Sequence, residues 1–213
     1  MSLDKYGNLN IVGNNYRNGS LLSISGVTFS DERIKTNIND INDDTALKQI
    51  LKIQPKTYNY IDQAERGSNL VIGFIAQQVK EVIPEAVSLE SQFIPNIYKT
   101  YDVINSNTIC INDSNIDKIN VGDILKINDG ITKNINANVI SKTSNEITVD
   151  AKLENTDCLV YGTKINDFHM IDKTYIFTLN VCATQELYKL IQQQQIIIND
   201  LQNRLSILEN KNI

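Results

Sequence analysis

The hydrophobic positions follow their most regular pattern near the C-terminus. Every seventh residue from 184 onward forms one column, and a second column lies three residues later: Thr184, Ile191, Ile198 and Leu205, then Leu187, Gln194, Leu201 and Leu208. The periodic segment spans residues 179–213, and no glycine or proline interrupts residues 181–213, so the pattern predicts a long helix with an a/d seam of about four heptads. Because such a helix has one apolar stripe, we expect an oligomeric coiled coil. The alternative is an amphipathic helix packed on its own domain.

Shorter patterns predict a mixture of helices and strands in residues 30–95. Helical spacing is found at Ala46, Leu47, Ile50 and Leu51, with N-cap candidates at Asp43, Asp44 and Thr45 and a stop near Gln54 set by Pro55. Residues 57–61 alternate as a strand does, and residues 70–75 are typical of a buried strand. Residues 77–82 predict a short helix that ends before Pro84.

Residues 96–163 carry repeated short runs rich in Ile, Val and Thr, separated by turn formers such as Asn128-Asp129-Gly130. The runs are Asn107–Ile111, Ile124–Ile127, Asn138–Ser141, Glu146–Val149 and Cys158–Tyr161. Five or six strands at this spacing predict a small antiparallel β-barrel or sandwich. The segment holds 6 Lys and 9 acidic residues, which argues against phosphate binding. The segment is either a solvent-exposed addition to the domain without a binding role, or a module that contacts a protein or a glycan.

Residues 1–29 predict very short strands separated by tight turns. Leu9, Ile11 and the run from Leu21 to Val27 are interrupted by Gly7, Gly13, Gly19 and Gly26. This segment is too small to hold a core, so it is the end of a longer β-structure or a segment that pairs with other chains. The predicted fold class is therefore α+β, with four parts: a β-rich stub at 1–29, a mixed domain at 30–95, an inserted barrel at 96–163, and the rest of the mixed domain with its coiled coil at 164–213.

Composition narrows the possible functions. Hydrophobic residues make up 41% of the 213 residues and charged residues 21%, which excludes wholesale disorder. The net charge of −5, without any basic stripe, predicts no nucleic-acid partner. The longest apolar run spans about seven residues, so we expect no membrane partner. Three widely spaced cysteines, Cys110, Cys158 and Cys182, predict neither a disulfide framework nor a zinc site but small buried side chains.

Three groups of residues, in this order, carry a resemblance to a known family. They are Phe29–Ile38, then Ile53–Tyr60 with Gly73–Val79 and Ile83–Val87, and finally Ala183–Leu187. The opening S-D-x-R-[LI]-K motif and the later G-F-[IV]-A-Q motif together resemble the C-terminal intramolecular chaperone domain, the peptidase S74 family. Such domains end endosialidase tail spikes, other phage tail fibres and the myelin regulatory factor. The resemblance covers about residues 30–95 and 165–213, and the insertion between Glu90 and about Asn166 departs from it.

The resemblance implies a homotrimer that helps a fibre segment fold and then cleaves its own chain. Carried over by position, Ser30 is the nucleophile, Lys35 is the general base and Phe29–Ser30 is the scissile bond. The N-terminal fibre segment is the folding client, and no metal or other cofactor is implied.

Elementary chemistry sets conditions on this pair. A serine hydroxyl needs a base, and lysine serves as one only when neutral, which requires burial or a nearby cation. Residues i and i+5 lie about 140° apart on a helix and on opposite faces of a strand. The pair therefore needs a turn between Ser30 and Lys35, or a lysine from a neighbouring chain.

Other residues have two interpretations each. Asp31 either caps the turn or holds Lys35 charged, and Arg33 either binds a carboxylate across the trimer or is an ordinary surface residue. Gln77 either bonds near the cleavage site or simply starts a helix, and Asn37 is a further supporting candidate. The only histidine, His169, has no nucleophile motif around it, so we expect it to be structural.

We therefore expect a self-cleaving assembly chaperone of a viral fibre or tail-spike-like protein, located in the virion or in the host cytoplasm during virus assembly. A non-catalytic trimeric module for structure or receptor binding is the alternative. A released part of a transcription factor, of the myelin regulatory factor type, is a third hypothesis, disfavoured by the missing basic and membrane segments.

Overall fold

The computed structural model describes residues 2–3, 9–10, 15–17, 20–22 and 30–211, in two compact units, 1–41 and 42–213. The first unit has two antiparallel strand pairs and one 3-10 turn: β1 (Ser2–Leu3) with β2 (Leu9–Asn10), β3 (Asn15–Arg17) with β4 (Ser20–Leu22), and η1 (Glu32–Ile34). Very short strands were predicted here. The predicted turn glycines, Ile11 and Val27 lie outside the described residues.

Six strands of the second unit close into an antiparallel barrel, because β10 pairs with both β11 and β13. Their order around the barrel is β10 (Ile124–Asn128), β11 (Ile135–Lys142), β12 (Glu146–Val149), β9 (Thr108–Cys110), β8 (Lys99–Asn105) and β13 (Asp157–Ile171). Alternate residues point inward: Leu125 and Ile127 are fully buried, whereas Lys126 between them points outward. Ile109 and Ile147 oppose each other in the same core. The predicted barrel is confirmed.

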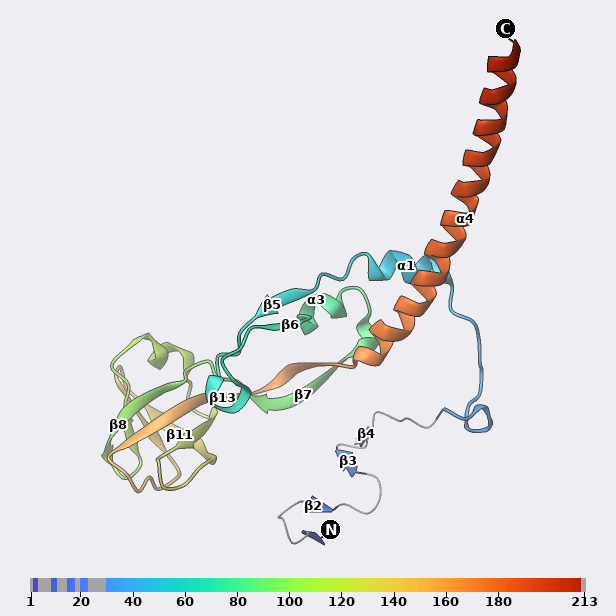
Figure 1. Ribbon diagram of the computed structural model, residues 1–213. Helices are drawn as coiled ribbons and strands as arrows, with labels where there is room; N and C mark the ends of the chain where they lie inside the picture. Colours follow the sequence, from blue (N-terminus) through green and yellow to red (C-terminus); the bar gives the residue numbers. More distant parts are fainter. Residues whose placement is uncertain (1, 4–8, 11–14, 18–19, 23–29, 212–213) are drawn as a thin grey trace. The chain divides into compact units, whose positions relative to one another are not determined.

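Strand β13 belongs to the barrel and also to a two-stranded ribbon (Figure 1). Its first residues pair with β8 and β10, and Lys164–Ile171 pair with β7 (Val87–Phe93). The sequence did not predict β7 or β8. Only Tyr101 of β8 is buried, so most of the strand lacks the apolar alternation that marks its neighbours.

A second core lies where the start of α4 (Lys173–Lys211) packs against α1 (Asp43–Ile50), α3 (Ala76–Lys80) and η2 (Pro84–Ala86). It contains Ala46, Ile53, Val79, Ile83, Ala86 and Leu179. The N-cap of α1 is Asn42, one residue before the predicted candidates, and its Oδ1 accepts a hydrogen bond from Thr45 N at 2.8 Å. The helix ends at Ile50 rather than near Gln54, because 3-10-type bonds tighten its last turn and direct Ile53 into the core.

The hairpin of β5 (Lys56–Tyr58) and β6 (Val71–Gly73) is exposed on one face, and α2 (Gln63–Arg66) lies between its strands in sequence. The prediction of a buried strand at 70–75 was wrong. Leu70 is 65% exposed and Ile72 is 77% exposed, because none of the described residues packs over that face of the two-stranded sheet. Gly73 on the other face lies against the ring of Tyr58.

Helix α4 starts six residues before the predicted segment at 179–213 and contributes to the second core only near its beginning. Leu179 and Ala183 are buried, whereas residues 187–210 are all exposed. The exposed residues include the predicted seam positions Ile191, Ile198, Leu201 and Leu205, at 57, 46, 54 and 57%. The α+β class and the long helix are confirmed. The coiled coil, the trimer and the domain boundaries stay predictions.

The chain enters the barrel through residues 94–98, which lie against Gly162 of β13. Ile94 N and Tyr98 N donate to the carbonyl oxygens of Thr163 and Tyr161, each at 3.0 Å. The Asn96 side chain forms two hydrogen bonds with Thr163, each at 3.0 Å. Its Oδ1 accepts from Thr163 N, and its Nδ2 donates to Thr163 Oγ1. A Cβ at position 162 would collide with the Ile94 carbonyl oxygen and lie 2.9 Å from Asn96 N.

We predict that Gly162→Ala destabilises the protein by about 3 kcal/mol or more, because backbone atoms cannot yield as a flexible side chain does. Gly122→Ala is the matched control. Gly122 also has a positive φ (93°), but nothing lies within 4 Å of the added Cβ, so the cost is about 1–2 kcal/mol. Urea unfolding followed by circular dichroism measures both. Equal losses for the two variants would contradict the role assigned to this close approach.

Candidate functional site

Ser30 and Lys35 flank the short turn η1. The Asp31 side chain caps this turn, since its Oδ1 accepts a hydrogen bond from Arg33 N at 2.9 Å. Ile34 N and Lys35 N donate to the carbonyl oxygens of Asp31 and Glu32 at 3.3 and 3.0 Å. Aspartate is favoured at such positions because its short side chain reaches the backbone two residues on. The turn that a Ser30–Lys35 contact requires is therefore present.

The structure brings Ser30 and Lys35 together within one chain. Nζ of Lys35 donates a hydrogen bond to Oγ of Ser30 at 2.7 Å. This separation suits proton transfer, since a charged lysine donates across it and a neutral lysine accepts the serine proton across it. Residues 30–41 are exposed in the single chain, so nothing described here shields this pair from water.

Asp31 is held by Arg33 rather than by Lys35. Nε and Nη2 of Arg33 donate to Oδ1 and Oδ2 of Asp31 at 2.9 and 2.7 Å, so the guanidinium binds both carboxylate oxygens. The hydrogen bonds from the side chain and backbone of Arg33 lower the pKa of Asp31, and Asp31 raises the pKa of Arg33. Of the two roles considered for Asp31, the structure has the cap. The carboxylate bound by Arg33 is in its own chain.

Asn37, Gln77, Phe29 and His169 complete the set of residues that the sequence singled out. Asn37 adopts a left-handed backbone (φ 53°), which asparagine tolerates, and its carbonyl oxygen accepts from Asn39 Nδ2 at 2.9 Å. Gln77 is exposed in α3 of the second unit, and Phe29 lies outside the described residues. His169 lies half-buried in β13, opposite Leu89.

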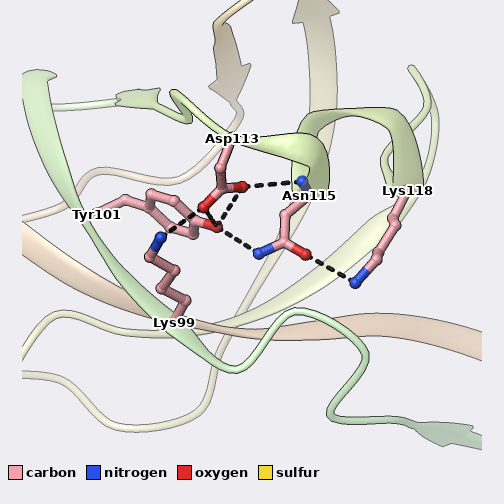
Figure 2. Close-up of polar contacts among 5 residues, drawn as sticks. All are labelled: Lys99, Tyr101, Asp113, Asn115 and Lys118. Carbon is pink, nitrogen blue, oxygen red and sulfur yellow. Dashed lines mark hydrogen bonds and ion pairs between the residues drawn. The ribbon is translucent and has the colours of Figure 1, made fainter.

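The inserted barrel holds a polar cluster that the sequence did not reveal (Figure 2). Lys99 Nζ lies 2.6 Å from Asp113 Oδ2, and the Tyr101 hydroxyl donates to the same oxygen at 3.0 Å. Asn115 Nδ2 donates to that hydroxyl at 2.7 Å, and Lys118 Nζ donates to Asn115 Oδ1 at 2.7 Å. The hydrogen bond from Lys99 is the main cause that lowers the pKa of Asp113. These groups satisfy one another and fasten η3 (Ser114–Lys118) to β8, so the cluster is structural.

A buried carboxylate joins the barrel to the neighbouring part of the second unit. Asp62 is 2% exposed, and its Oδ1 accepts from Glu65 N at 3.1 Å and from the Tyr98 hydroxyl at 3.2 Å. Lys126 Nζ lies 3.5 Å from Glu65 Oε1 and 4.5 Å from the centre of the Tyr161 ring. Burial opposes the charge on Asp62, but its hydrogen bonds and Lys126 outweigh burial and lower its pKa. Burial and Asp62 raise the pKa of Tyr161 to about 12.

The other buried acid and the cysteines are structural. Asp129 is 1% exposed and accepts from the backbone N of Ile131, Thr132 and Glu154, which fixes the predicted turn at 128–130. Cys158 is buried, and burial raises the pKa of its thiol to about 12, which disfavours the reactive thiolate. Cys110 and Cys182 are half-buried, so full burial, which was predicted for all three cysteines, is found for Cys158 alone.

Candidate metal-binding clusters and membrane-spanning helices are both absent from the described residues. Nowhere among them do three or more His, Cys, Asp or Glu side chains gather in a way that suits a metal ion. No helix in this part of the chain has the length and the hydropathy to cross a membrane.

Comparison with known proteins connects the turn at Ser30 to a family. Residues 30–88 match the family model of the chaperone of endosialidase, peptidase S74. The resemblance predicted from the motifs is thus confirmed, and the match begins at Ser30. Its range also contains the β5–β6 hairpin and α3.

A viral relative matches over a larger part of the chain. It is "Uncharacterized protein VP1" of Micromonas pusilla reovirus (isolate Netherlands/2005), 30% identical over 234 aligned residues. The alignment covers 85% of this chain and 12% of that protein, so the chain spans about an eighth of the relative's length. The family match is thus to a chaperone that is also classed as a peptidase, and the relative is a viral protein.

We predict that Asp62→Asn destabilises the protein by about 1 kcal/mol at pH 7 and by much less at pH 3. The pKa of Asp62 is lower in the folded chain than the value of about 3.9 for unfolded peptides, so its stabilisation is present above pH 4. That stabilisation disappears as the pH falls through the folded pKa. Urea unfolding at both pH values measures the difference, with the exposed Asp102→Asn as control. An equal loss at pH 7 and pH 3 would contradict a charged role for Asp62.

Proposed function

We propose that this chain is a homotrimeric, self-cleaving assembly chaperone of a viral fibre or tail-spike-like protein, with cleavage between Phe29 and Ser30. The observation that carries the proposal is the 2.7 Å separation between Lys35 Nζ and Ser30 Oγ, at the start of the matched range. Ser30 is the nucleophile and Lys35 the general base of a Ser–Lys dyad.

The reaction needs only this chain and water. Lys35 takes the hydroxyl proton while Ser30 Oγ forms a bond to the carbonyl carbon of Phe29. The bond from that carbon to the Ser30 nitrogen breaks, the nitrogen takes a proton from Lys35, and an ester between Phe29 and Ser30 Oγ remains. Water then hydrolyses the ester to give the Phe29 carboxylate and a free Ser30 amine and hydroxyl. The attacked Phe29 belongs either to the same chain or to another copy.

The exposed stripe of α4 supports assembly through this helix. Ile191, Ile198, Leu201 and Leu205 repeat at a and d positions and are about half exposed in the single chain. Packing of such a and d side chains between those of neighbouring helices removes them from water, and this burial stabilises a coiled-coil assembly. In the proposed trimer, residues 1–29 continue the fibre that is the folding client, and residues 96–163 form the inserted barrel.

We predict that the full chain converts to a fragment that begins at Ser30 and ends at Ile213, as measured by intact mass. Ser30→Ala and Lys35→Ala each leave the full-length chain, because they remove the nucleophile and the base. Ser68→Ala and Lys52→Ala are matched controls, since both residues are exposed and lie outside η1, and they keep wild-type cleavage. If the wild-type chain stays intact while it forms a trimer, the non-catalytic structural or receptor-binding module is the better interpretation.

We predict that Ile198→Glu converts the trimer to a monomer in sedimentation experiments, because three carboxylates would face one another at a seam position. Ile196→Glu is the matched control. It changes the same residue type two positions away, 69% exposed and on the opposite side of the heptad, so the trimer is retained. A wild-type monomer, or equal loss of assembly in the two variants, would contradict the proposed coiled coil.

A further inference from the structure

The contacts of Asp31 bear on how the proposed dyad keeps its base available. Asp31 follows Ser30 directly and lies four residues before Lys35, so it is a carboxylate close to the catalytic ammonium group in sequence. A carboxylate accepts stronger hydrogen bonds from a lysine ammonium group than a serine hydroxyl does. An ion pair with Asp31 would also hold the lysine in its charged form, in which it cannot accept the serine proton. The proposed chemistry therefore requires that Asp31 does not bind Lys35.

Arg33 meets this requirement in the structure. Its Nε donates a hydrogen bond to Asp31 Oδ1 and its Nη2 donates to Oδ2, and its backbone N also donates to Oδ1. The Asp31 carboxylate accepts no hydrogen bond from Lys35, whose Nζ lies on Ser30 Oγ.

We propose that Arg33 is a positioning residue for the proposed cleavage: it binds the Asp31 carboxylate at both oxygens and so leaves Lys35 to Ser30. The inference rests on the proposed function, since it assigns a role within the Ser30–Lys35 reaction. A planar guanidinium matches the two oxygens of a carboxylate, whereas a lysine at position 33 would bind as a point charge and leave one oxygen open. Glu32 and Asp40, the other acids of residues 30–41, are exposed, and among the described residues the side-chain contact of Lys35 is with Ser30 rather than with either of them.

The test is the pH dependence of self-cleavage in the full chain. Full-length protein purified in denaturant is diluted into buffers from pH 6 to pH 10, and the loss of full-length mass is followed, with circular dichroism as a record of folding. For wild type we expect a rate that rises with pH as Lys35 becomes neutral. In Arg33→Gln, the freed Asp31 holds Lys35 charged to higher pH, so the midpoint shifts upward by about half a pH unit, the size expected for an exposed ion pair.

Three further variants separate this role from a merely structural one. In Arg33→Lys, the midpoint shifts upward by less than in Arg33→Gln. In Asp31→Asn, the cap is kept without a carboxylate, so the midpoint does not rise. The double variant Asp31→Asn/Arg33→Gln returns the midpoint to the wild-type value, because no carboxylate remains to bind Lys35. Lys48→Gln is the control, since it removes an equally exposed pair, Lys48–Asp44 at 2.6 Å, and leaves the midpoint unchanged.

Failure of this inference differs from failure of the proposed function. Wild-type cleavage at Ser30 with an unshifted midpoint in Arg33→Gln would overturn the role of Arg33 alone. A midpoint that stays shifted in the double variant would do the same, because the effect would not act through Asp31. Absence of wild-type cleavage at every pH would overturn the proposed function and, with it, the inference.

Discussion

The backbone pairings of β13 hold the second unit together. One strand of 15 residues closes the barrel against β8 and β10, pairs with β7 beyond Gly162, and reaches the second core at Ile171 just before α4. Side chains on a strand alternate between faces, so a shift of one residue in its register would invert the buried and exposed positions of both the barrel and the ribbon. Residues 94–96 approach Gly162 closely, and Asn96 forms two hydrogen bonds with Thr163. These contacts fix that register where the strand leaves the barrel. The insert is thereby joined to the family-matched part by two neighbouring strands and by the buried Asp62.

The parts of the fold that the sequence predicted are those in which burial is local and complete. Ile124–Ile127 and Glu146–Val149 alternate strictly because one face of each strand is fully inside the barrel. Strand β8 was missed because its ends are polar and exposed, and its place is set by pairing with β13, some 55 positions later in sequence. The hairpin at 56–73 shows the opposite error. Its apolar residues suggested burial, but the exposed face of Ile72 has no covering element in the single chain.

For the candidate site, the sequence supplied the residues and the structure supplied their arrangement. Ser30 and Lys35 were chosen through the family resemblance, and their spacing indicated only that a turn was needed. Asp31 forms that turn as a cap, but its ion pair with Arg33 was not predicted, because residues two apart do not face each other on a regular helix. The Asp62 and Asp113 clusters were missed for another reason. Their partners lie on elements that only the folded barrel brings together, and no local motif marks them.

The exposure of Lys35 links the proposed chemistry to the proposed assembly. A lysine becomes a base only after it loses its own proton, and contact with water opposes that loss. Residues 30–41 are exposed in one chain, and Arg33 removes the competing carboxylate without excluding water. If Lys35 is the proposed base, the exclusion of water comes from a surface other than the described residues of the single chain. The a and d side chains of α4 are about half exposed in the single chain, which is why the proposed function includes packing of further copies against this stripe.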